Sequence, residues 1–242
     1  LIDAGAQTIG DPTQCHAVAI DARAPKYDGG IVSRLDSVSF GIVVNQEGHR
    51  FYDEGEDFWP KRYAIWGRLV AQQPSQIASS IVDNKVRAQF MPSIFPAIEG
   101  SSIGDLATKL KIDSQTLKIT VKHFNHAVQH GVYEPSRLDG KKTVGLYPNK
   151  TNWSLPLDSP PFLAYPLKPG ITFTYLVLKI NAQAEVLNKD DTPFDNVTAA
   201  GEIMAGNILG EGYCAGTGMT IGLSLIHISE PTRPLYISYA VF

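Results

Sequence analysis

The stretch 199–222 reads AAGEIMAGNILGEGYCAGTGMTIG and holds seven glycines but neither serine nor proline. Flexible linkers combine glycine with serine or proline, whereas here apolar residues stand between the glycines. A glycine has no Cβ atom, so such a run indicates backbone that must come close to another group. Thr217 stands where a helix would begin, and a helix N-terminus presents amide groups to electron-rich oxygens. We therefore expect a ligand oxygen near Gly216, Thr217 and Gly218; the alternative is a glycine-rich turn with a packing role only.

The phrases AAGEIMAG and GYCAGTGMTIG resemble the last FAD-contacting segment of the fumarate reductase and succinate dehydrogenase flavoprotein family. The likeness extends over about residues 1–222. It implies FAD as the cofactor, with Glu202 accepting hydrogen bonds from ribityl or ribose hydroxyls. The cofactor-binding residues implied by the resemblance are Gly201, Glu202, Ala215, Gly216, Thr217, Gly218 and Met219.

The resemblance also implies an α+β fold that combines a capping domain with the C-terminal piece of a Rossmann-like FAD-binding domain. Residues 1–15 would end the first FAD-domain segment, 16–173 would form the capping and substrate domain, and 174–222 would form the C-terminal FAD-binding segment. The sequence opens without the strand and G-x-G-x-x-G turn of a dinucleotide-binding domain, so we expect the N-terminal FAD half to be missing.

Residues 223–242 depart from this pattern and read LSLIHISEPTRPLYISYAVF. The segment reads like an in-frame translation of adapters used in sequencing libraries, so we treat it as a non-native tail. His227, Glu230 and Arg233 then have no functional role.

The composition narrows the class of protein. The chain has 242 residues, 43% of them hydrophobic and 19% charged, with a net charge of −3. Without a basic cluster or a long apolar run, we expect no nucleic-acid partner and no membrane span. The two cysteines have no metal-ligand spacing, and His123, His126 and His130 are expected to be solvated rather than to bind a metal. A reducing cytoplasm is the expected compartment.

Local patterns predict several elements. A strand over 40–44, a hairpin loop over 45–48 and a returning strand over 49–52 follow one another. A helix is expected from Pro60 to about Gln73, and two further helices are expected after caps at Ser102 and Asp113. Further strands are expected over 79–83, 171–180 and 184–187.

The family resemblance assigns roles to residues outside the glycine-rich stretch. Arg62 would transfer the proton, with Arg68 in reserve; the alternative for Arg62 is an ion pair with Asp57 or Glu56. Tyr213 would act as a catalytic hydrogen-bond donor, or as an aromatic lid on the flavin. The implied substrate-binding residues are His16, Ser33, Arg34, Thr172 and Phe173.

Arg34 stands where the family has a negative charge, which suits a substrate with an additional carboxylate. The implied reaction is the oxidation of tricarballylate to cis-aconitate, by proton abstraction and hydride transfer to flavin N5. The electrons would pass to an acceptor protein or a quinone pathway. The alternatives are a 3-ketosteroid Δ1-dehydrogenase type of enzyme with an apolar slot, a fumarate reductase or succinate dehydrogenase type, and a non-catalytic fragment unable to hold FAD alone.

Overall fold

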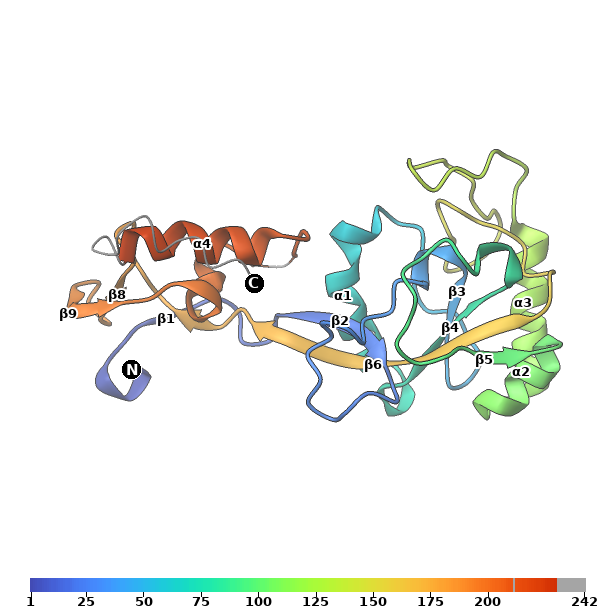
Figure 1. Cartoon of the computed structure of the whole chain (residues 1–242), viewed down its shortest axis with the longest axis horizontal. Helices are drawn as coiled ribbons and strands as arrows, with labels where there is room; N and C mark the ends of the chain where they lie inside the picture. Colours follow the sequence, from blue (N-terminus) through green and yellow to red (C-terminus); the bar gives the residue numbers. More distant parts are fainter. Residues whose placement is uncertain (211, 230–242) are drawn as a thin grey trace. The chain divides into compact units, whose positions relative to one another are not determined.

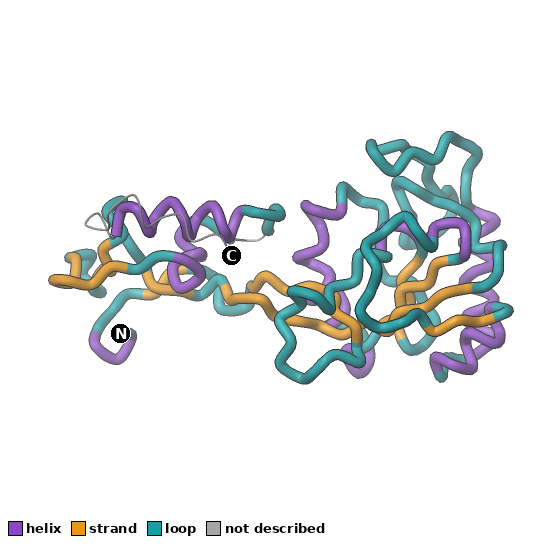
Figure 2. The backbone as a smooth tube through the Cα atoms, viewed as in Figure 1, coloured by secondary structure: helices purple, strands orange, loops and turns teal. Residues whose placement is uncertain are grey.

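The computed structural model describes residues 1–210 and 212–229. The chain divides into two compact units, which Figures 1 and 2 draw together. The central unit is Ala17–Thr172, and the terminal unit combines Leu1–His16 with the chain from Phe173 onward. In the sequence, the central unit is therefore inserted between the two segments that form the terminal unit.

The central unit is built on a five-stranded sheet. Its strand order is β2-β6-β4-β3, and β5 pairs with β6 as well. Strand β6 pairs antiparallel with β4 and β5, and β4 pairs antiparallel with β3. The long strand β6 thus contacts three others and organises the sheet. The strands are β2 (Cys15–Asp21), β3 (Ile42–Asn45), β4 (Ala78–Val82), β5 (Ile98–Gly100) and β6 (Phe162–Thr174).

Alternate residues of each strand enter two different cores, because successive side chains of a strand point to opposite faces. Val43 packs in one cluster with Trp66 and Val70 of α1 (Trp59–Ala71). Its neighbours Ile42 and Val44 pack in the other cluster, against α2 (Ile103–Leu110) and α3 (Ser114–Ala127). The sheet therefore lies between α1 on one face and α2 with α3 on the other (Figure 1).

The predicted helix starts are confirmed. The Ser102 hydroxyl accepts the Asp105 N–H at 3.1 Å, and Asp113 Oδ1 accepts the Thr116 N–H at 2.8 Å. Pro60 is the second residue of α1. Leu117 and Phe124 on α3 are fully buried, as their helical spacing predicts. Three 3₁₀ turns complete the central unit: η2 (Val38–Phe40), η3 (Pro74–Gln76) and η4 (Asn84–Val86).

The returning strand predicted over 49–52 is wrong. The turn at 45–48 forms as expected, with the Gly48 N–H donated to the Asn45 carbonyl at 3.0 Å, but a single bridge joins Val44 to Arg50. The chain then turns so that the buried Arg50 meets Glu54, with 2.6 Å between Nη2 and Oε2. Glu54 Oε1 also accepts the Val43 N–H at 2.8 Å, so a side chain occupies the edge of β3 where a paired strand would continue.

The terminal unit combines short elements around one core. Its 3₁₀ turn η1 (Ile2–Ala4) closes at Gly5, which has φ 102°. Strand β1 (Thr8–Ile9) pairs with β7 (Val177–Leu178), and β8 (Glu185–Leu187) pairs with β9 (Pro193–Thr198). The 3₁₀ segment η5 (Gly201–Asn207) and helix α4 (Thr217–Ser229) follow. Their core includes Ala6, Tyr175, Met204 and Ile221, so it joins the first residues of the chain to the last described ones.

Within the described ranges, each helix is too short or too polar to cross a bilayer. Of the adapter-like segment 223–242, the first residues continue α4. Residues 230–242, with Glu230 and Arg233, lie outside the described part of the chain, and so does the side chain of His227.

Candidate functional site

The glycine-rich ribbon, residues 199–222, forms η5, a connecting turn and the start of α4. Helix α4 begins at Thr217, where the sequence predicts it. Gly206 is required by packing, because an added Cβ would lie 1.9 Å from the Tyr175 carbonyl oxygen. A Cβ at Gly222 would lie 3.5 Å from the Gly201 Cα, so the start of α4 runs close to the start of η5. Packing therefore requires glycine at Gly206, whereas a Cβ at Gly222 would make only an ordinary van der Waals contact.

Other glycines of the ribbon have no such neighbour. A Cβ built at Gly201, Gly210, Gly212 or Gly216 meets no described atom within 4 Å. Gly201 and Gly216 have φ of +83° and +89°, a conformation that L-residues rarely adopt. Gly210 has no positive φ to explain it. Neither packing nor backbone conformation within the described residues accounts for Gly210, so its open face is suited to a group outside this chain's own fold.

The start of α4 is closed by the chain itself. Thr217 N–H donates to the Cys214 carbonyl at 3.0 Å, and Gly218 N–H donates to Tyr213 Oη at 3.2 Å. Ala215, Gly216 and Met219 are exposed around this turn. Glu202 is exposed on η5. The predicted cofactor-binding residues are thus brought together on one accessible ribbon of the terminal unit.

Three predicted substrate or catalytic residues form an aromatic cluster in the terminal unit. The His16 ring stacks on Phe173, with centroids 5.1 Å apart and an interplanar angle of 11°. Tyr213 meets the His16 ring edge-on at 4.1 Å. Tyr175 touches Phe173 and donates its hydroxyl to the Gly212 carbonyl at 3.3 Å. His16 and Phe173 are buried here, and Tyr213 links them to the N-terminus of α4.

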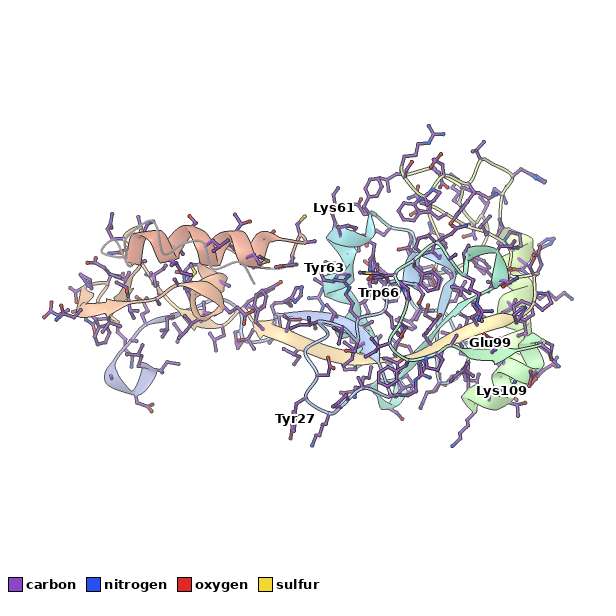
Figure 3. The ribbon with its side chains drawn as sticks, viewed as in Figure 1. Tyr27, Lys61, Tyr63, Trp66, Glu99 and Lys109 are labelled. Carbon is purple, nitrogen blue, oxygen red and sulfur yellow. The ribbon has the colours of Figure 1, made fainter. Side chains whose placement is uncertain are left out.

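Arg34 lies in the central unit and is held by a carboxylate. Its Nε and Nη2 donate to the two oxygens of Asp36 at 2.8 and 3.0 Å. Its guanidinium lies 4.7 Å from the centre of the Tyr63 ring, and the Trp59 indole N–H donates to Asp36 at 2.5 Å. Burial opposes the charge, but the hydrogen bond to Asp36 prevails and raises the pKa of Arg34. Tyr63 is labelled on α1 in Figure 3.

Arg62 lies on the same helix and pairs with Glu56, with 3.2 Å between Nε and Oε2. Glu56 also accepts the Tyr52 hydroxyl at 2.8 Å. Burial, followed by the hydrogen bond to Glu56, raises the pKa of Tyr52 to about 12. The ion pair that the sequence offers as an alternative for Arg62 is therefore present, while its role in proton transfer stays a prediction.

Two further substrate candidates serve the loop before β3. The Ser33 hydroxyl donates to Asp28 at 2.6 Å and is fully buried. The Thr172 hydroxyl donates to the Gly29 carbonyl at 3.0 Å. Both side chains fasten this loop within the central unit, and their contact with a substrate stays a prediction.

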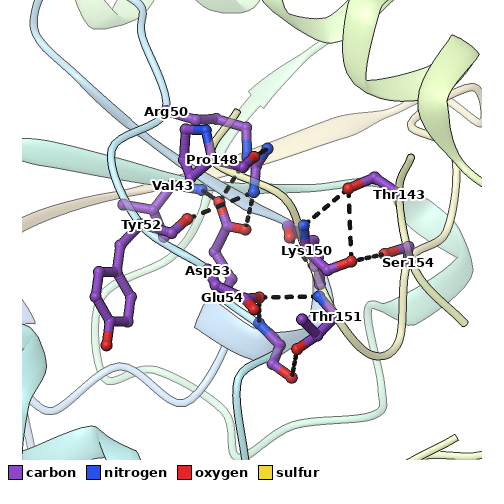
Figure 4. Close-up of polar contacts among 12 residues, drawn as sticks. Val43, Arg50, Tyr52, Asp53, Glu54, Thr143, Pro148, Lys150, Thr151 and Ser154 are labelled. Atoms are coloured by element: carbon purple, nitrogen blue, oxygen red, sulfur yellow. Dashed lines mark hydrogen bonds and ion pairs between the residues drawn. The ribbon is translucent and has the colours of Figure 1, made fainter. Parts of the chain in front are cut away.

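A buried polar network in the central unit escaped the sequence reasoning (Figure 4). The Lys150 ammonium is fully buried and donates to the Ser39 and Gly41 carbonyls at 2.8 and 2.7 Å. Burial lowers the pKa of Lys150 to about 8, partly opposed by the charge of Glu54. A single lysine in a loop-rich segment carries no local signal of this role. Asp36 and Trp59 were missed as well, although the Arg34-Asp36 spacing is a signal that could have shown the pair.

The described residues hold no group of three or more histidine, cysteine, aspartate or glutamate side chains that could bind a metal ion. Cys15 and Cys214 are not joined in a disulfide.

Comparison with known proteins defines the class. The FAD binding domain family matches residues 4–221, nearly the whole of the described chain. This chain belongs to the FAD binding domain family, and its cofactor is FAD. The match ends one residue before the position at which the family likeness was expected to stop. The open faces of the ribbon glycines fit such a cofactor, because a flavin can approach the backbone there without meeting a side chain.

Particular relatives are enzymes. The chain is 30% identical to an NADH:fumarate oxidoreductase of Klebsiella pneumoniae over 170 residues, which is 68% of this chain and 17% of the relative. It is 27% identical to an NADH:acrylate oxidoreductase of Vibrio harveyi over 70% of this chain and 16% of that protein. It is 24% identical to a 3-oxosteroid 1-dehydrogenase of Mycobacterium tuberculosis over 78% of this chain and 38% of that protein. The chain thus spans about a sixth of the length of the first two relatives.

Solved structures share the fold. The open conformation of a flavocytochrome c3 fumarate reductase matches with a TM-score of 0.67 and 21% identity, over 94% of this chain and 37% of that one. A 3-ketosteroid Δ1-dehydrogenase of Sterolibacterium denitrificans matches with a TM-score of 0.63 and 21% identity, over 95% and 45%. The mixed helix and sheet fold expected from the sequence is confirmed by these matches.

Proposed function

We propose that this chain supplies part of the flavin site of an oxidoreductase acting on a carbon–carbon bond beside a carboxylate or carbonyl group. The observation that carries the proposal is the open face of Gly210, which neither packing nor a positive φ explains. The relatives support the reaction class, because fumarate, acrylate and 3-oxosteroids each place such a bond beside a carbonyl carbon. FAD, when bound, supplies the exchange of hydride.

The chain's own residues then bind, orient and move protons. The ribbon backbone at Gly210 and Gly216 would lie against the flavin, and Glu202 would accept hydrogen bonds from its hydroxyl groups. Tyr213 already holds the Gly218 N–H, so its hydroxyl stands where it would orient a substrate oxygen or shift to admit one. Arg62 would pass the proton, with Glu56 holding the guanidinium in place. An acceptor protein or a quinone pathway would take the electrons.

The substrate that we infer is a small carboxylate. Tricarballylate was expected because Arg34 adds a positive charge, but both outer nitrogens on one edge of that guanidinium bond Asp36. Asp36 compensates the charge, so Arg34 gives no advantage to a third carboxylate over the two of a dicarboxylate. Tricarballylate remains one member of the class to be assayed, together with succinate and fumarate.

A 3-ketosteroid substrate is the second candidate, favoured by the relatives that act on 3-oxosteroids. It requires an apolar slot long enough for four fused rings. The carboxylate ranks first because the relatives named for fumarate and acrylate are 30% and 27% identical to this chain, whereas the 3-oxosteroid dehydrogenase is 24% identical.

Flavin binding tests the ribbon directly. Riboflavin, FMN and FAD share the isoalloxazine ring, so all three should bind this chain with similar affinity if the ribbon contacts that ring. Quenching of flavin fluorescence measures the binding. Gly210→Trp fills the open face and should abolish the quenching. Gly131→Trp adds the same ring at an exposed glycine of the central unit and should leave it unchanged. Equal quenching by the wild type and by G210W would refute the proposed contact, and no quenching at all would favour a fragment that cannot hold the flavin alone.

Activity is tested in a protein that carries this chain together with a complete flavin domain. The assay follows reduction of an artificial acceptor with succinate, tricarballylate or a 3-ketosteroid, and oxidation of a reduced dye with fumarate or acrylate. We expect turnover with the carboxylates. Turnover with the ketosteroid alone would replace the carboxylate by the second candidate.

A further inference from the structure

An aromatic pocket lies in the central unit, between the start of α1, the η2 turn and the loop that precedes β6. Its volume is about 130 Å³. The aromatic pocket is lined by Ser39, Phe40, Phe58, Trp59, Pro60, Pro135 and Trp153. Ser39 and Trp153 are buried, the other three aromatic rings are half-buried, and the two prolines are exposed. The buried pair therefore forms the floor, the half-buried rings form the walls, and the prolines form the rim.

The polar edges of both indole rings are engaged outside the aromatic pocket. The Trp59 N–H donates to Asp36 at 2.5 Å, and the Trp153 ring N–H donates to the Arg137 carbonyl at 2.8 Å. The two indoles therefore offer the pocket carbon surface and ring faces. Lys61, labelled in Figure 3, lies above the Phe58 ring with its ammonium 6.0 Å from the centroid.

The floor is held in an uncommon conformation. Trp153 has φ 55°, in the left-handed region that bulky residues rarely adopt. Its backbone N–H is fixed by Asp139 Oδ1 at 2.9 Å. A strained residue that its surroundings keep in place is frequent at ligand sites. The ring of Trp153 also contacts Phe58, with centroids 5.9 Å apart, so floor and wall form one aromatic surface.

Ser39 supplies a polar atom on this floor. The residue is 6% exposed, and its hydroxyl oxygen is buried without a hydrogen-bond partner among residues 1–210 and 212–229. Burying a hydroxyl without a partner is unfavourable. The backbone of Ser39 is fixed, because its carbonyl accepts the Lys150 ammonium. The side chain can still rotate about its Cα–Cβ bond. Such a rotation would turn the hydroxyl toward a ligand in the aromatic pocket, which Ser39 lines.

The size and lining select the ligand. A buried water needs two to four polar partners, and one hydroxyl does not supply them. An apolar cavity of ~150 Å³ accommodates benzene, so this volume suits one six-membered ring. None of the seven lining residues is acidic, and the Lys61 ammonium already lies above Phe58, so a cationic ligand is disfavoured. We propose that the aromatic pocket binds a neutral six-membered ring that carries one hydroxyl or carbonyl group, which hydrogen-bonds Ser39.

Binding is tested on the whole chain with 4-fluorophenol and fluorobenzene, followed by fluorine NMR line width and shift. The wild type is expected to bind 4-fluorophenol about tenfold more tightly than fluorobenzene. Ser39→Ala should remove this preference and leave the affinity for fluorobenzene unchanged. Ser37→Ala is the matched control, since Ser37 lies two residues away and pairs its hydroxyl with that of Ser80 at 2.8 Å; it should retain the tenfold preference.

A second variant tests the location without disturbing the floor. Pro135→Trp places a ring over the mouth from an exposed loop position, and both probes should lose binding. The proposal is overturned if the wild type binds neither probe at millimolar concentration, or if P135W binds them as well as the wild type does. An unchanged preference in S39A overturns the assigned hydrogen bond. These outcomes do not depend on flavin, so they are independent of the proposed oxidoreductase.

Discussion

Two glycines of the central unit and two of the ribbon differ in what surrounds them. In the central unit, a Cβ at Gly41 would lie 1.9 Å from the Ile81 carbonyl oxygen, and one at Gly67 would lie 2.5 Å from the Ala17 carbonyl carbon. In the ribbon of the terminal unit, a Cβ at Gly210 or Gly212 would meet no described atom within 4 Å. The first pair is dictated by the packing of the chain on itself, and the second pair is left unexplained by it.

The buried charged groups of the central unit, like Gly41 and Gly67, are explained by contacts within that unit. Arg50 and Glu54 pair with each other, and Lys150 bonds two carbonyls of the same unit. Each buried charge thus finds its partner within the unit. The comparison teaches that the buried charges and the tightly packed glycines of the central unit are explained by its own interior, whereas Gly210 of the ribbon is not explained by the described residues.

The largest effect is expected at the buried ion pair. Glu54→Gln leaves the Arg50 charge buried without compensation, since the two side chains are 0% and 3% exposed. Loss of one partner of such a pair costs about 3–5 kcal/mol of unfolding free energy. Glu56→Gln is the matched control, because the Arg62–Glu56 side chains are about one-third exposed and exposed pairs contribute ~0–1 kcal/mol. Chemical denaturation measures both; equal losses would contradict the contrast between buried and exposed pairs.

Gly67→Ala tests whether packing requires a glycine inside α1, where alanine would ordinarily be the more stable residue. Within a helix, alanine is favoured over glycine by about 1 kcal/mol. Gly67 lies inside α1, but its Cβ would meet backbone atoms of Ala17 and Val18 at 2.5 to 2.7 Å. Overpacking against backbone should therefore destabilise the chain by about 3 kcal/mol. A rise in the midpoint of denaturation would show that the close contact of α1 with β2 is wrong.

Lys150 makes the stability of the chain depend on pH. Its pKa falls from 10.5 to about 8 in the folded state because burial disfavours the ammonium. Between these values the unfolded chain holds a proton that the folded chain lacks, so the unfolding free energy rises as the pH rises through this window. At ~1.4 kcal/mol per pKa unit the gain is up to about 3 kcal/mol. Lys150→Met removes this titration, and the difference between the two proteins from pH 7 to 10.5 isolates it; parallel curves would refute it.

The smallest effect is expected in the ribbon. Gly210→Ala adds a methyl group where no described atom lies within 4 Å, so the unfolding free energy should change by less than about 0.5 kcal/mol. Flavin fluorescence quenching by the same variant should fall, because the methyl group occupies the approach. A destabilisation as large as that of G67A would remove the difference between the two kinds of glycine.

Local signals in the sequence predicted much of the fold. Ser102 and Asp113 act through side chains three residues from the amides that they cap, so the spacing in the sequence is sufficient to find them. The turn at 45–48 and the start of α4 at Thr217 are local in the same sense. The strand over 49–52 failed because the Glu54 side chain bonds both the buried Arg50 and the Val43 N–H of β3, and the alternation typical of a strand does not report such side-chain contacts.

The backbone part of the candidate site, the glycine-rich ribbon, could be predicted from the sequence. The ion pairs between side chains were harder to predict. The ribbon was found from its glycines, and Tyr213 from its place beside them. The partners that fix the arginines were harder: Glu56 was offered for Arg62 as an alternative, whereas Asp36 was not offered for Arg34. Lys150 joins the Ser39 and Gly41 carbonyls across about 110 residues, a contact that only the fold creates.

Tyr175 offers its carbonyl oxygen at a junction of three distant segments. A Cβ at Gly10 or at Gly206 would lie 1.9 Å from that one oxygen, so both glycines press against it. Residues 17–172, 156 in number, must be synthesised between the first segment and the other two. At ~5–20 residues per second, the ribosome takes about 10–30 s to do so. The core of the terminal unit consequently cannot close before the residues that follow Thr172 have been synthesised.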